Sequence, residues 1–182
     1  MPKTIAKPVL TWLEKNNARY EAVGHRQVFT AQDKAATLKI DPKQVAKSVV
    51  LNLGPRNHFI VSVPANKNVD LKKIKEFLNK ARKKNKEKPI TKINFTKELW
   101  LKKNLKKSEP GAILPLGSFY KLEHLLDNSL LKQKFLIING GCTWQSLKMT
   151  PAQLIKLEKD FFRKTNLATA KPKPKKVSSE RK

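Results

Sequence analysis

The sequence predicts a single domain of the mixed α/β class. The chain has 182 residues, the length of one domain, and 39% of them are hydrophobic, which is enough for one core. Segments with helical periodicity alternate with short apolar runs typical of strands, and no internal repeat is visible. We therefore expect residues 1–167 to form the domain and residues 168–182 to form a basic, disordered tail.

The N-terminal segments predict two helices with a strand between them. Residues 9–16 predict a short amphipathic helix, and residues 20–23 predict a strand. Thr30 and Asp33 form a start that resembles a capping box, because the Thr30 hydroxyl can accept a free N–H and Asp33 can reach back. The helix that they open is expected to continue to about Leu38.

A hairpin pattern predicts the middle of the sheet. Residues 48–53 and 58–63 are β-rich runs, separated by the turn Gly54-Pro55-Arg56-Asn57. Asp41-Pro42 is expected to open another short helix before the first run, and Lys47 to close it. The remaining predicted elements are a helix over 71–81 capped by Asp70, a charged loop over 82–88, a strand over 90–95, a helix capped by Thr96, a last strand over 135–138, and a helix from Thr150 that carries Leu154, Leu157 and Phe161.

Charge is the strongest compositional signal. Forty Lys and Arg against fourteen Asp and Glu give a formal net charge of +26 and an isoelectric point near 10.3. Such a field attracts polyanions. Residues 71–107 hold fifteen Lys or Arg and three Asp or Glu, and residues 171–182 hold six and one. A lysine-rich proteome is an alternative explanation for part of the surplus, but it does not easily explain this clustering.

Several classes of protein are disfavoured by the sequence. No apolar run approaches the roughly 18 residues of a spanning helix, and the N-terminus has no signal-peptide pattern. A single cysteine, Cys142, cannot form an internal disulfide, and three scattered histidines do not add the spacing of a zinc site. We expect a cytoplasmic protein without a membrane association, metal or cofactor.

An ordered set of motifs gives the chain a resemblance to a known family. The motifs are His25, Thr30-Ala31, Ala46-Lys47-Ser48-Val49-Val50-Leu51, Val63-Pro64-Ala65, Val69-Asp70-Leu71, Gly111-Ala112-Ile113-Leu114-Pro115-Leu116-Gly117, Leu126-Asp127, Ile138-Asn139-Gly140-Gly141 and Thr150-Pro151-Ala152-Gln153-Leu154. In this order they are similar to the YbaK and ProX-type aminoacyl-tRNA deacylases and to the editing domain associated with prolyl-tRNA synthetase. The resemblance covers roughly residues 5–157.

The resemblance implies both a fold and an activity. The implied fold is a central mixed, mostly antiparallel, partly closed sheet flanked by helices. The implied activity is trans-editing, which is hydrolysis of alanyl- or cysteinyl-tRNA for proline, or of a related mischarged tRNA. Aminoacyl-tRNA is then the substrate, and prolyl-tRNA synthetase is a further candidate partner. The alternative is a noncatalytic basic module that binds RNA or docks on a synthetase.

Lys47 and the glycine loop are the predicted catalytic residues. A lysine at the edge of a strand can hold a phosphate or the carbonyl of the substrate, and the Ala46-Lys47-Ser48 match favours this role over a solvated side chain. Gly111 and Gly117 are expected to let backbone amides approach the oxyanion, with Ala112 and Pro115 beside the substrate. Many relatives have a small hydroxyl residue where this chain has Leu114, so only a backbone role is expected there.

The other predicted site residues bind the substrate. Asn139, Gly140 and Gly141 are expected to form a close-approach turn against the aminoacyl group, and His25 and Thr30 to line the pocket. Cys142 is interpreted as a small buried residue and not as a nucleophile, because no histidine is near it in sequence.

No Ser-His-Asp set or pair of carboxylates is visible in the sequence. The family implies instead that the ribose hydroxyl of the substrate activates water, while the protein positions the ester and stabilises the oxyanion. A pocket sized for small side chains would act as a second sieve, since one methylene discriminates by only about 1–3 kcal/mol in a synthetic site.

Overall fold

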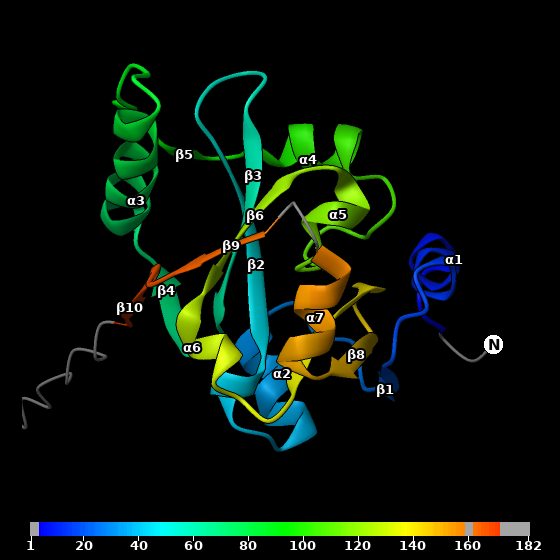
Figure 1. Cartoon of the computed structure of the whole chain (residues 1–182). Helices are drawn as coiled ribbons and strands as arrows, with labels where there is room; N and C mark the ends of the chain where they lie inside the picture. The colour runs from blue at the N-terminus through cyan, green and yellow to red at the C-terminus, as the bar shows by residue number, and fades with distance from the viewer. Residues whose placement is uncertain (1–3, 159–161, 172–182) are drawn as a thin grey trace, which may run out of the picture.

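The computed structural model describes residues 4–158 and 162–171 (Figure 1). The helices are α1 (Lys7–Lys15), α2 (Ala31–Leu38), the 3-10 turn η1 (Pro42–Gln44), α3 (Leu71–Lys84), α4 (Glu98–Asn104), α5 (Gly117–Tyr120), α6 (Asn128–Leu131) and α7 (Pro151–Glu158). The strands are β1 (Glu21–Gly24), β2 (Ala46–Asn52), β3 (His58–Pro64), β4 (Lys67–Val69), β5 (Asn94–Phe95), β6 (Glu123–Asp127), β7 (Leu136–Cys142), β8 (Gln145–Met149), β9 (Phe162–Thr165) and β10 (Ala168–Ala170).

A five-stranded mixed sheet forms the centre of the domain. Its strand order is β5-β2-β3-β6-β9, with the predicted β2–β3 hairpin antiparallel and the β3–β6 and β6–β9 pairs parallel. The antiparallel sheet β1-β8-β7 lies beside it, and a bridge between Val45 and Ile137 joins the two. A third, small sheet pairs β4 with β10. The described strands form no closed barrel, and the predicted mixed α/β fold is confirmed.

The two faces of the central sheet bury different cores. Alternate residues of β3 point to opposite faces, so Phe59, Val61 and Val63 pack against Ile74 and Leu78 of α3. The opposite face packs on α5 and α7 through residues such as Phe119, Leu126 and Leu154. Figure 1 shows α3 on one side of the sheet and α5 and α7 on the other.

Several predicted element boundaries were wrong. The helix expected after Asp41 is only the turn η1, so Lys47 lies inside β2 and does not close a helix. Helix α3 continues to Lys84, three residues into the predicted charged loop, because its basic residues are good helix formers and favour the C-terminal end of the helix dipole. The Thr96 side chain does not cap α4, because Lys97 occupies the N-cap position of that helix. The backbone N–H of Thr96 donates instead to the Val50 carbonyl.

Several strands were not predicted from the sequence, and the first residues of the predicted tail form a strand. Strand β5 covers only two residues of the predicted strand 90–95, and β4, β6, β8, β9 and β10 were not predicted. Residues 168–170, assigned above to the tail, form β10 on β4. Lys171 is also described, whereas residues 172–182 of the predicted tail and Phe161 of the last predicted helix lie outside the described residues. Within the described ranges, none of the helices has the length and apolar character that crossing a membrane requires.

Candidate active site

A cavity of about 290 Å³ opens between the start of α2, the start of β2 and the end of β7. Thr30, Lys47, Gly111, Ala112 and Asn139 line it. Five of the predicted site residues, from segments far apart in the sequence, therefore meet around one space. Further lining residues are Val28, Phe29, Ala31, Lys34, Ala46, Ser48, Cys142 and Thr143.

Lys34 is a nearly fully buried lysine in the wall of this cavity, and it was not among the site residues predicted from the sequence. Its side chain is 4% exposed, and its ammonium donates to Oδ1 of Asn139. Burial lowers the pKa of Lys34 to about 8. The available signal was its helical position, since Lys34 lies one turn after Ala31 and one turn before Leu38, on the face of α2 that packs inward.

Asn139 joins Lys34 to the glycine loop. Its Nδ2 donates to the Ile113 carbonyl at 2.8 Å, while its Oδ1 accepts from Lys34. Asn139 lies in β7, where the register with β8 shifts between Asn139 and Cys142. The amide is thus fixed at both ends, and residues 139–141 continue the strand through a β-bulge where a turn was expected.

Lys47 lies beside the cavity on β2, opposite Val63 of β3. Its ammonium donates to the Lys67 carbonyl of β4 at 2.6 Å. Burial lowers the pKa of Lys47, and the positive charge of Lys171 lowers it further. The side chain is half-buried, so its charge acts in a medium less polar than water.

The glycine loop presents Gly111 to the cavity. Gly111 has a φ of +81°, a conformation that favours glycine, and a Cβ at this position would lie 3.8 Å from the Phe29 carbonyl. The Ala112 N–H donates to the Glu109 carbonyl at 3.0 Å and is already satisfied. Among the described residues the Gly111 N–H has no hydrogen-bond partner, so it is a donor available to a substrate.

Glu109 ties this loop to the turn between β7 and β8. Its Oε2 accepts from the N–H of Thr143 at 3.1 Å and from the Thr143 hydroxyl at 3.2 Å, and its own N–H donates to the Gly141 carbonyl at 2.9 Å. These bonds hold Gly111 against the cavity without using its amide.

Thr30 and Cys142 complete the wall. The Thr30 hydroxyl accepts from the Asp33 N–H at 3.0 Å and donates to the Asp33 carboxylate at 2.7 Å, which confirms the predicted cap of α2. Cys142 is 3% exposed, and burial raises the pKa of its thiol. A thiol held protonated is a poor nucleophile, in agreement with its interpretation as a packing residue.

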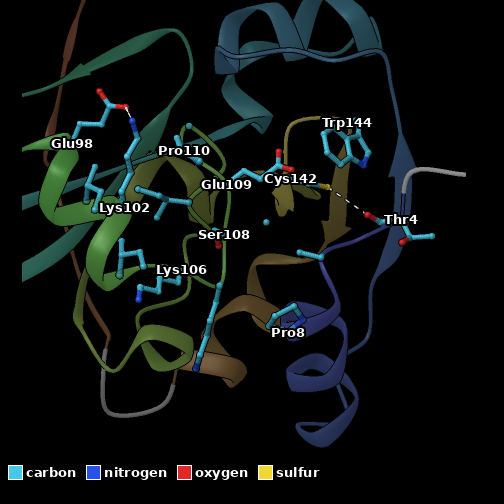
Figure 2. Close-up of a pocket in the computed structure, with 17 residues that line it drawn as sticks. Thr4, Pro8, Glu98, Lys102, Lys106, Ser108, Glu109, Pro110, Cys142 and Trp144 are labelled. Atoms are coloured by element: carbon cyan, nitrogen blue, oxygen red, sulfur yellow. Dashed lines mark hydrogen bonds and ion pairs between the residues drawn. The ribbon is translucent and has the colours of Figure 1, made fainter. Parts of the chain in front are cut away.

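A larger cavity of about 640 Å³ adjoins the smaller one, and the two share Gly111 and Cys142. Figure 2 shows Lys102 and Lys106 of the α4 region on one side of it, with Thr4, Pro8 and Trp144 across from them. Lys102 is paired with Glu98 at 2.7 Å. The larger cavity therefore combines apolar walls with a cationic rim.

Five other predicted site residues do not line the smaller cavity. The His25 ring donates from Nδ1 to the Arg26 carbonyl at 2.8 Å, and its Nε2 lies 2.9 Å from the Ser146 hydroxyl. Pro115 is buried, and the Gly117 N–H donates to Glu158 at 2.9 Å. The Gly140 carbonyl accepts from Ala6, and Gly141 lines the larger cavity.

Comparison with known proteins places this geometry in a family. The sequence profile of the aminoacyl-tRNA editing domain matches residues 25–157. The chain belongs to the aminoacyl-tRNA editing domain family. The matched span contains all residues that line the smaller cavity, whereas Thr4, Ala6 and Pro8 of the larger cavity precede it.

Solved structures share the fold of this editing domain at low sequence identity. A proposed trans-editing enzyme for prolyl tRNA synthetase aligns with a TM-score of 0.73 and 19% identity, over 93% of this chain and 100% of that one. A scaffold protein from computational epitope grafting aligns with a TM-score of 0.74 and 20% sequence identity, over 92% of this chain and 99% of that one. The hypothetical protein APE2540 aligns with a TM-score of 0.72 and 15% sequence identity, over 90% of this chain and 100% of that one. At these identities the similarity shows the fold alone. A search of curated proteins found no match.

Proposed function

We propose that this editing domain is a trans-editing deacylase that hydrolyses the ester bond of mischarged tRNA. One observation carries the proposal. The nearly fully buried Lys34, the half-buried Lys47 and the Gly111 N–H all lie around one small cavity. Two cations and an amide donor in a confined space suit a reaction in which negative charge develops on a carbonyl oxygen.

The two cavities suggest how the substrate is divided. The smaller cavity, about 290 Å³, is at the low end of ligand pockets and fits a small aminoacyl group. The larger cavity, about 640 Å³, can hold the terminal nucleoside, with its base on the apolar wall and its phosphate near the lysines of the α4 region. The ester bond then lies at their shared wall, beside Gly111.

In this arrangement the protein positions the ester and stabilises charge. Lys34 and the Gly111 N–H serve the carbonyl oxygen as it becomes negative, and Lys47 orients the aminoacyl or phosphate end of the substrate. Water is activated by the ribose hydroxyl of the substrate. The size of the cavity favours small acyl groups, and we propose alanyl- or cysteinyl-tRNA for proline, or a related mischarged tRNA, as the substrate.

The test is hydrolysis of alanyl- and cysteinyl-tRNA for proline by the purified chain. We expect multiple turnovers without prolyl-tRNA synthetase, and no hydrolysis of correctly charged prolyl-tRNA. Tight binding of these tRNAs without ester hydrolysis would instead favour a noncatalytic RNA-binding or synthetase-docking module.

A further inference from the structure

A row of polar side chains crosses the central sheet on the face that packs against α5 and α7. It runs from Ser48 of β2 through Ser62 of β3 and His124 of β6 to Glu158 at the end of α7. Ser62, His124 and Glu158 have no exposed surface, whereas Ser48 is half-buried and lines the smaller cavity. The row therefore connects the candidate active site with the interior of the domain.

The strand register brings the members into hydrogen-bonding distance. Ser48 and Ser62 are direct partners in the β2–β3 hairpin, and their hydroxyl oxygens lie 3.0 Å apart. His124 is opposite Ile60 in the parallel β3–β6 pair, so it shares a face with Ser62, two residues along. The Ser62 oxygen lies 2.9 Å from Nε2 of His124, and Nδ1 lies 3.0 Å from Oε2 of Glu158.

Glu158 is held at the far end of the row by α5. Its Oε2 also accepts the Gly117 N–H at 2.9 Å, and its Oε1 accepts the Ser118 hydroxyl at 3.1 Å. A Cβ on residue 117 would lie 2.2 Å from the Leu122 carbonyl and 2.8 Å from Cβ of His124. Only glycine permits this approach, which gives Gly117 a structural role in the row and not a place at the cavity.

These contacts fit one direction of the hydrogen bonds in which every member of the row has a partner. Glu158 already accepts two donors, so in the arrangement that we infer, Nδ1 of His124 also donates to Glu158 and Nε2 accepts from Ser62. The Ser62 hydroxyl then donates to Nε2, and the Ser48 hydroxyl donates to Ser62. The proton of Ser48 is committed to the interior, so the lone pairs of its oxygen remain for the cavity.

We propose that this row makes Ser48 a dedicated hydrogen-bond acceptor for the α-amino group of the aminoacyl ester. The inference rests on the proposed function. Among the described residues lining the cavity there are two lysines and no carboxylate, so a charged ammonium group is repelled there. A neutral α-amino group still needs an acceptor for its N–H, and in this arrangement the Ser48 oxygen provides one. Ser62 and His124 are positioning residues that act through Ser48.

The test compares alanyl-tRNA for proline with propionyl-tRNA for proline, in which hydrogen replaces the α-amino group. Each kcat/KM is divided by the spontaneous hydrolysis rate of the same ester, which removes the intrinsic effect of the amino group on reactivity. For the unmodified chain we expect a preference for the alanyl ester of about tenfold, the size of one hydrogen bond. Ser48→Ala and Ser62→Ala should reduce this preference to about twofold or less.

Ser146→Ala is the matched control. Ser146 is also fully buried and bonded to a histidine ring, His25, but it does not line either cavity. We expect it to leave the preference unchanged. A loss of packing alone would lower both rates together, whereas the proposed role changes their ratio. If Ser62→Ala does not fold, the ester preference of Ser48→Ala tests the inference, since Ser48 is only half-buried.

The outcomes separate this inference from the function on which it rests. Equal normalised rates for the two esters in the unmodified chain, or an unchanged preference in Ser48→Ala, overturn the inference and leave the deacylase proposal intact. Hydrolysis of neither ester overturns both.

Discussion

The ammonium group of Lys34 donates a hydrogen bond to Oδ1 of Asn139, 105 positions later in the chain. This hydrogen bond holds a nearly fully buried cation at the wall of the candidate active site. Burying a charged lysine costs free energy that one amide oxygen does not fully offset, which is why the pKa of Lys34 is lowered to about 8. A group that is costly for the fold and central to the cavity is a candidate for function.

We predict that Lys34→Met stabilises the fold at pH 7 and abolishes deacylation. The lowered pKa of Lys34 corresponds to a cost of about 3 kcal/mol in the charged state. Removing the buried charge recovers this cost, but part of the recovered stability is lost again because Oδ1 of Asn139 no longer has the Lys34 donor. We therefore expect the free energy of unfolding to rise by up to about 2 kcal/mol. Denaturant titration measures it, and a clear decrease in stability would contradict the assigned cost.

The same shift makes stability depend on pH with a defined sign. The folded pKa of Lys34, about 8, is below the ordinary value of 10.5, so the unfolded chain binds more protons between these values. Stability should therefore rise from about pH 8 to pH 10 relative to Lys34→Met. Denaturant titrations of the two chains at matched pH values would show this difference; parallel curves would refute it.

Activity should show the opposite dependence, because Lys34 is proposed to act as a cation. After correction for spontaneous hydrolysis, kcat should fall with an apparent pKa near 8, and Lys34→Arg, which stays charged, should remove this fall. A kcat that rises through pH 8 would mean that the neutral amine is the active form.

Gly111→Ala should lower kcat more than it lowers tRNA affinity. A side chain at φ +81° costs about 1 kcal/mol and displaces the amide proposed to serve the oxyanion, while the one described atom within 4 Å of the new Cβ is the Phe29 carbonyl oxygen at 3.8 Å. Gly54→Ala is a matched control, since Gly54 lies in the β2–β3 turn and also has a positive φ, +147°, and a Cβ there would have no described atom within 4 Å. Equal decreases of kcat and affinity in Gly111→Ala would mean that the loop binds RNA and does not act on the ester.

The basic C-terminal segment should set tRNA affinity and leave amino-acid choice unchanged. Residues 172–182 include five Lys or Arg. Replacing these five by Gln should raise KM and flatten the log–log salt dependence by about 0.7–0.9 for each phosphate that is no longer neutralised. The ratio of alanyl to cysteinyl hydrolysis should stay the same, because phosphates carry no information about the esterified residue. If the salt dependence of the substituted protein equals that of the unmodified chain, the segment does not contribute to tRNA affinity.

Local signals predicted the parts of the site that lie in motifs. Thr30 was found from a capping pattern, and Lys47, Gly111 and Asn139 from motifs beside strands or in a glycine loop. Lys34 was missed because one lysine among many has no motif, and its burial depends on Asn139, which is distant in sequence. His124 and Glu158 were missed for a related reason: His124 meets Ser62 only through the parallel β3–β6 pair, Glu158 of α7 meets His124 only in the folded chain, and β6 was itself not predicted.

The most direct measurement of the central claim is deacylation of alanyl- and cysteinyl-tRNA for proline by the unmodified chain, Lys47→Ala and Lys43→Ala. Lys47 lines the smaller cavity, whereas Lys43 is exposed on η1 and its ammonium lies 4.0 Å from the Asp41 carboxylate, its one ion pair among the described residues. We predict multiple turnovers for the unmodified chain and for Lys43→Ala. For Lys47→Ala we predict a decrease of at least about 100-fold in kcat/KM with an intact melting transition. Hydrolysis by Lys47→Ala at the rate of the unmodified chain, or no hydrolysis by any of the three proteins, would contradict the account.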